Sequence, residues 1–191
     1  MATQAELARR QRRQLEAEDA ANLDAIARAY AVMWDRLQGD VDALMLAIED
    51  LDNPTIAEIE ALSQYKNLTR RMEEELDRFN VYLETVIASV GLAAITAGLA
   101  DSAALIGAAG VEFTGLESSA MKYLLEYLQT DGPLYARLQL ITDGTIDRVV
   151  DAIIDGVGKG YNPRKIADLI QDAFGGGLTD ALRNTRTVQI Y

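Results

Sequence analysis

Carboxylates, lysines, arginines, hydroxyls and amides are the polar side chains available for chemistry, because the sequence contains no histidine and no cysteine. This excludes disulfides, thiolate nucleophiles, Ser-His-Asp triads and zinc sites built on histidine or cysteine. Catalysis would have to rest on carboxylates, Lys, Ser/Thr or Tyr alone. We therefore expect a protein that is not an enzyme, and we assign no catalytic residue, no cofactor and no metal site.

The many carboxylates form charged helix faces rather than a catalytic pair. Three glutamates at 73–75 lie between Arg70-Arg71 and Asp77, which is typical of an exposed, ion-paired helix face. Aspartates at 147, 151 and 155 recur every four residues opposite an apolar face, and they predict a solvated stripe. A di-metal carboxylate bundle would normally also need histidines.

A glycine-rich stretch, GVGKG at 156–160, resembles a phosphate-binding loop only superficially. A phosphate loop follows a strand, has the order Gly-x-x-x-x-Gly-Lys-Ser/Thr, and opens a helix at its lysine. Here a helical pattern precedes the glycines, so the stretch predicts the C-terminal cap of a helix.

Charge is distributed unevenly along the acidic chain. The net charge is −12, from 18 basic and 30 acidic residues, which disfavours broad binding to nucleic acid. Four arginines nevertheless gather near the N-terminus: Arg9, Arg10, Arg12 and Arg13. This cluster is either a solvated helix end, which we favour, or a weak contact for DNA or an acidic partner.

The most apolar segment, 85–100, has sixteen residues and is rich in Ala and Gly. A membrane-spanning helix needs about 20 residues. We interpret the segment as a buried helix, expect no membrane association, and see no apolar core of a signal peptide at the N-terminus.

Hydrophobic periodicity predicts an all-α fold that opens with a long antiparallel helical hairpin. Apolar residues recur every three or four positions from Leu23 to Leu51 and again from Ile56 to Val90, which is the pattern of helices packed lengthwise. The first helix is expected over 4–51. In Asn53-Pro54 the asparagine is expected to cap a second helix that starts at the proline.

Small residues form a stripe within the second long helix. They are Ser89, Ala93, Ala94, Ala97 and Gly98, at four-residue spacings. Such spacing lets helix backbones approach closely, either inside a core, which we favour, or at a helix-docking or self-association surface.

A small bundle of short helices is expected after the hairpin. Thr114-Gly115-Leu116-Glu117 predicts a capping box, and further starts are predicted at Pro133, Asp143-Gly144-Thr145, Pro163 and Thr179. Gly175-Gly176-Gly177 is expected to end the helix that begins at Pro163. We divide the chain into a hairpin region at 1–113 and a short-helix bundle at 114–191.

The C-terminal third carries a recognisable series of motifs. Residues 160–164 read Gly-Tyr-Asn-Pro-Arg, Ile166-Ala167 and Ile170 follow, and residues 184–187 read Asn-Thr-Arg-Thr. With these motifs, residues 144–191 resemble the phage head morphogenesis family, the minor head proteins related to the F protein of phage Mu and the minor capsid protein of phage SPP1. The matching positions are Gly160, Asn162, Pro163, Arg164, Arg186 and Thr187. Val188 departs from the family, which usually has Glu there.

The resemblance implies a virion structural or assembly protein. It would lie inside the capsid near the portal protein, and in the host cytoplasm during assembly, and would aid head assembly or DNA ejection. Its partners would be the portal, other head proteins or a second copy of itself. The alternative is an N-terminal delivery or interaction domain of a larger polypeptide that carries a C-terminal enzyme or toxin.

Overall fold

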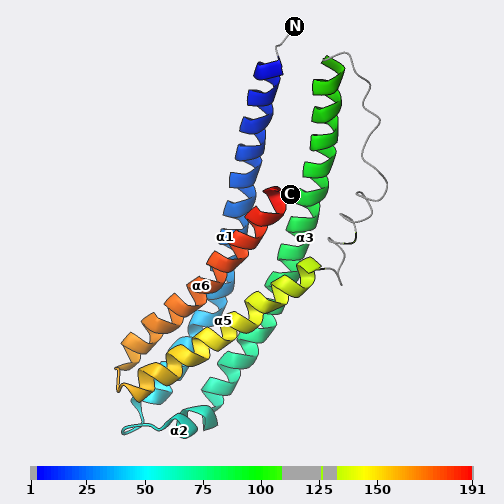
Figure 1. The fold of residues 1–191 in the computed structure, drawn as a ribbon. Helices are drawn as coiled ribbons and strands as arrows, with labels where there is room; N and C mark the ends of the chain where they lie inside the picture. Colours follow the sequence, from blue (N-terminus) through cyan, green and yellow to red (C-terminus); the bar gives the residue numbers. More distant parts are fainter. Residues whose placement is uncertain (1–3, 109–125, 127–132, 191) are drawn as a thin grey trace.

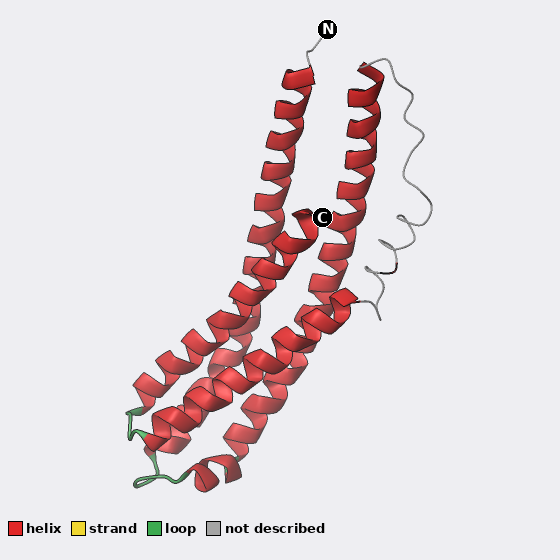
Figure 2. Ribbon diagram, viewed as in Figure 1, coloured by secondary structure: helices red, strands yellow, loops and turns green. Residues whose placement is uncertain are grey.

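The computed structural model of the chain describes residues 4–108, 126 and 133–190, and every regular element in these residues is helical (Figures 1 and 2). The elements are α1 (Gln4–Glu49), α2 (Ile56–Ala61), α3 (Ser63–Ala108), α5 (Pro133–Gly158) and α6 (Pro163–Ile190). The predicted all-α class is confirmed. The domain boundary proposed near residue 113 and the capping box at 114–117 lie outside the described residues.

The two longest helices, α1 and α3, lie side by side and run antiparallel (Figure 1). Arg36 of α1 pairs with Glu75 of α3, and one turn further along α1, Asp40 pairs with Arg71, one turn back along α3. Each helix has 46 residues and is therefore about 69 Å long. Helices α5 and α6 pack against one half of this pair, so the other half projects beyond them (Figure 2).

The hydrophobic core lies where α1, α3, α5 and α6 meet. The apolar seams read from the sequence supply it, with Ile26 to Ile48 of α1 and Leu68 to Ile87 of α3 buried at helical spacing. Among the described side chains, none of α1 before Ile26 and none of α3 after Ile87 is buried. The projecting ends of the two helices are thus a two-helix extension outside the core.

The turn between α5 and α6 has the predicted caps. Gly160 has a φ of +64°, and the amides of Gly160 and Tyr161 donate to the carbonyls of Val157 and Gly156, both at 2.9 Å. This pattern is a Schellman motif, which satisfies the last carbonyls of α5. The side chain of Asn162 accepts from the Lys165 amide at 2.9 Å and caps α6, which begins at Pro163.

The predicted cap at Asn53-Pro54 is wrong by two residues. Asn53 has a φ of +53° and lies in the turn, whereas Thr55 is the N-cap of α2. Thr55 and Glu58 form a capping box, which satisfies two backbone amides where Asn53 would satisfy one. Leu62, with a ψ of 136°, then separates α2 from α3, so the second seam runs over two helices.

The predicted bundle of short helices is also wrong, because α5 and α6 are long. Helix α5 continues through Asp143-Gly144-Thr145, and α6 continues through Gly175-Gly176-Gly177 and Thr179. The two threonines do not cap new helices. The hydroxyl of Thr145 donates to the Ile141 carbonyl at 2.7 Å, and that of Thr179 donates to the Gly175 carbonyl at 3.4 Å, each within its own helix.

Close packing explains the continuity of α6 at its glycines. Gly177 is buried, and a Cβ at this position would overlap the hydroxyls of Thr145 and Tyr30. The Tyr30 hydroxyl donates to the Phe174 carbonyl at 2.6 Å, and the Tyr30 and Phe174 rings lie 4.9 Å apart. Consecutive glycines locally disfavour a helix, but the tertiary contacts of α6 with α1 and α5 keep this segment helical.

Burial raises the pKa of Tyr30 well above its ordinary value of about 10. Tyr30 therefore loses its hydroxyl proton at a lower pH in the unfolded chain than in the folded protein. The contribution of Tyr30 to the free energy of unfolding is fully present below pH 10, and it is lost as the pH rises toward the pKa of the folded state. We expect the wild-type free energy of unfolding to decline more steeply above pH 10 than that of Tyr30→Phe. Urea denaturation between pH 8 and pH 11 measures this, and parallel profiles would contradict it.

Candidate functional site

The two groups of residues proposed as contact sites lie at the same end of the molecule. Arg9 and Arg13 are exposed in the first turns of α1, and Arg10 and Arg12 lie in the same turns with side chains outside the described set. The small residues Ser89, Ala93, Ala94, Ala97 and Gly98 lie on the part of α3 that runs toward this end, because α1 and α3 are antiparallel (Figure 1). Of these five, the side chain of Ser89 is described, and it is exposed.

The residues that carry the family resemblance occupy the α5–α6 turn and α6. Gly160, Asn162 and Pro163 build the turn, Arg164 is exposed, and Ile166 and Ile170 are buried in the core. Arg186 and Thr187 lie near the end of α6, and their side chains are not described. The described motif positions therefore act through backbone geometry and packing.

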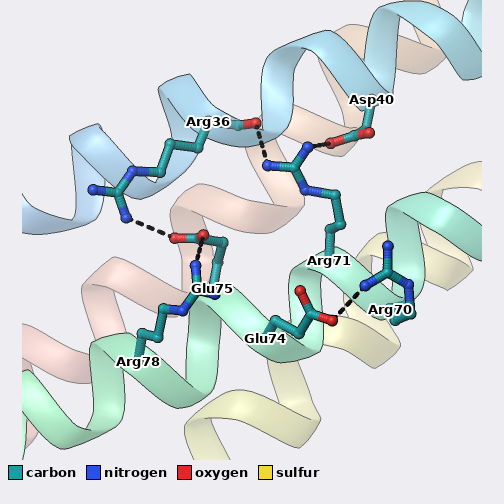
Figure 3. A network of polar contacts seen from close by, with 7 residues as sticks. All are labelled: Arg36, Asp40, Arg70, Arg71, Glu74, Glu75 and Arg78. Carbon is teal, nitrogen blue, oxygen red and sulfur yellow. Dashed lines mark hydrogen bonds and ion pairs between the residues drawn. The ribbon is translucent and has the colours of Figure 1, made fainter.

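A charged cluster that the sequence pattern did not predict lies between α1 and α3. Glu75 is 4% exposed, so its prediction as part of an exposed face is wrong. Its carboxylate accepts from Arg36 of α1 at 3.0 Å and from Arg78 of its own helix at 2.5 Å (Figure 3). The burial is tolerated because both carboxylate oxygens are paired with guanidinium groups.

A second ion pair extends the same cluster along the two helices. Arg71 of α3 lies 3.2 Å from Asp40 of α1, and Arg71 also donates to the Arg36 carbonyl at 3.5 Å (Figure 3). On the outer face, Arg70 pairs with Glu74. The sequence signal for Glu75 is its position: it lies beside the buried Leu76, with Arg71 and Arg78 one turn away on either side.

A shallow groove between α1 and α3 adjoins this cluster. It has a volume of about 280 Å³, and its charged lining consists of Arg28, Arg36, Arg78 and Glu75. Its apolar lining consists of Ala29, Val32, Met33, Phe79 and Tyr82. Val32 is 48% exposed and Tyr82 is 36% exposed. With three cations and one anion, the groove is locally basic on a strongly acidic chain.

The charged lining of the groove is one carboxylate and three guanidinium groups. Glu75 is held between two guanidinium groups, and the remaining lining supplies cations and apolar surface. Within the described residues, no cluster of three or more Asp and Glu side chains is placed to hold a metal ion. None of the helices in these residues has an apolar stretch that could span a membrane.

Comparison of the chain with protein-family models, with curated proteins and with solved structures finds no match.

Proposed function

We propose that the chain is a non-enzymatic structural protein of a phage head, a minor head protein that docks on the portal inside the capsid. The observation that carries this proposal is the two-helix extension. About six turns of α1 at its N-terminal end, with exposed Arg9 and Arg13, and the opposing end of α3 project beyond the buried core. A projecting helical pair of this kind presents side chains to a partner protein.

The assignment to a phage head rests on the motifs at 160–170 and 184–187. In support, the Gly-Tyr-Asn-Pro-Arg segment forms a tight turn between two helices, as the family pattern expects for this element. The role proposed for the extension is attachment to the portal, from which the protein would aid head assembly or DNA ejection. The arginines at 9–13 would add a weak contact to packaged DNA or to an acidic partner.

Size-exclusion chromatography with light scattering tests the proposal, using the chain alone and mixed with the portal protein from the same genome. We expect a complex that contains both proteins. The matched variants replace Arg9 and Arg13, or Lys66 and Lys165, with glutamine, because each pair is exposed and each double substitution changes the charge by the same amount. We expect the first pair to weaken the complex and the second to leave it unchanged.

Separate elution of the chain and the portal protein would contradict the proposal. A downstream open reading frame that continues this chain into an enzyme or toxin domain would instead support the alternative, a delivery or interaction domain.

A further inference from the structure

The outward face of α1 carries an ordered stripe of exposed residues opposite the buried seam. The stripe runs over about 33 Å from Arg28 to Asp50, the residue after α1, whose amide still donates to the Leu46 carbonyl at 3.2 Å. Its members are Arg28, Val32, Asp35, Arg36, Gly39, Asp42, Ala43, Leu46 and Asp50, and all of them are exposed. Leu46 is 63% exposed and Val32 is 48% exposed, so two large apolar side chains face solvent here.

The residues on the two sides of Gly39 in this stripe are complementary at equal distances from it. Residues three positions away on either side are Arg36 and Asp42, an opposite-charge pair. Residues seven positions away are Val32 and Leu46, which are both apolar.

Arg28 and Asp50, eleven positions away on either side, again have opposite charges. Offsets of 3, 7 and 11 residues lie on one face of an α-helix, so all six residues share the face of Gly39.

We propose that a second copy of this chain packs on this stripe, with the two α1 helices antiparallel and the twofold axis at Gly39. In this register Val32 meets Leu46 of the partner subunit, Arg36 meets the partner's Asp42, and Arg28 meets the partner's Asp50. Because a twofold interface repeats each contact, the pair contains two apolar contacts and four ion pairs. The stripe is complementary to itself.

Space and charge at the stripe both suit this occupant. Apart from the neighbouring backbone of its own helix, no atom of the described residues lies within 4 Å of a Cβ built at Gly39, so a second helix backbone has room to approach closely there. Asp42 and Asp50 have no ion-pair partner within the described residues. A chain of net charge −12 repels its own copies at most surfaces, whereas this register places Asp42 and Asp50, the acids of the two charged pairs, against arginines.

The groove beside the stripe offers an apolar contact to the partner's Leu46. Val32 lines both the stripe and the groove, and Arg28 and Arg36 line the groove as well. Leu46 of the partner subunit would therefore reach the mouth of the groove, where the apolar side chains of Ala29 and Tyr82 extend the contact.

Cross-linking at the twofold axis tests the register directly, because the chain has no cysteine of its own. Two copies of residue 39 face each other across the axis, so Gly39→Cys is expected to form a disulfide-linked dimer under mild oxidation. Ala43→Cys is the matched control, since two copies of residue 43 would lie about 12 Å apart along the axis. Equal cross-linking of both variants, or of neither, would overturn the proposal.

Analytical ultracentrifugation tests the apolar contact. We expect a wild-type dimer whose dissociation constant rises at least roughly 30-fold in Leu46→Ser, because each dimer loses the leucine twice. Val81→Ser is the control: Val81 is 64% exposed on α3 and outside the stripe, so dimerisation should be unchanged. A wild-type monomer at the highest soluble concentration, or equal effects of the two variants, would overturn the proposal.

A charge swap tests the ion pairs. Arg28→Asp and Asp50→Arg each place like charges together twice, and each should weaken the dimer by roughly 10-fold. The double variant restores both pairs and should recover wild-type affinity. Arg28 also pairs with Asp24 of its own helix, but that pair is exposed, so Arg28 is preferred to Arg36, which holds the buried Glu75. A double variant as weak as the single variants would overturn the register.

This inference goes beyond the proposed function and does not rest on it. A chain that dimerises through α1 but ignores the portal protein would contradict the proposed function alone.

Discussion

Replacing Gly177 with alanine is expected to lower the free energy of unfolding by about 2–4 kcal/mol and the melting temperature by roughly 5–15 °C. The new Cβ would overlap the hydroxyls of Thr145 and Tyr30 where α6 crosses α5 and α1. Both hydroxyls are buried and already engaged, Thr145 with the Ile141 carbonyl and Tyr30 with the Phe174 carbonyl. Moving them away would therefore break hydrogen bonds in the core, and urea denaturation followed by circular dichroism measures the loss.

Gly175→Ala is the matched control in the same helix. Gly175 is exposed, and a Cβ built there would meet no atom of the described part of the chain within 4 Å other than the backbone of its own helix. Alanine at this position should raise the free energy of unfolding by about 0.5–1 kcal/mol, because it favours the helix and restricts the unfolded chain. Similar effects of the two substitutions would contradict the account of Gly177 as a packing requirement.

Phe174→Ala is expected to cost about 3–5 kcal/mol of stability. The ring is 2% exposed and lies 4.9 Å from the ring of Tyr30 and 5.1 Å from that of Trp34, measured between centroids. Its removal would leave a cavity between α6 and α1, because the two partner rings are fixed by their own packing. Thermal and urea unfolding of the purified chain measure the effect.

Leu140→Ala provides the control for this truncation. Leu140 is 70% exposed on α5, so the same kind of change should shift stability by less than about 0.5 kcal/mol. A Phe174→Ala variant as stable as Leu140→Ala would show that α6 does not contribute its ring to the core.

The core positions of the long helices were predictable because hydrophobic periodicity reports burial directly. Tyr30, Leu37 and Leu44 of α1, and Leu68, Met72 and Leu76 of α3, were expected in the seams and are buried. The caps at Gly160 and Asn162 were predictable for a similar reason, since each motif satisfies its backbone groups locally.

The continuity of α6 was not predictable from local rules. Three consecutive glycines normally end a helix, but at Gly177 the missing side chain is what lets α6 approach Tyr30 and Thr145. This contact joins residues that are far apart in the sequence, so no window of sequence contains it. The same is true of Glu75, whose burial depends on Arg36 from another helix.

The candidate groove was even less predictable. Its lining comes from both α1 and α3, and it forms only when the antiparallel register places Arg28 and Arg36 near Arg78 and Glu75. The self-complementary stripe, in contrast, lies within one helix, and its pattern around Gly39 can be read in the sequence once α1 is known to be continuous.

The pairing of Tyr30 with Phe174 also sets the order of events during protein synthesis. These residues are 144 positions apart, and ribosomes add about 5–20 residues per second. Tyr30 of the α1 seam is therefore made roughly 7–30 s before the Phe174 ring that covers it. During that time α3 is the first available cover, and the nascent chain is most exposed to aggregation and to chaperones until α6 emerges.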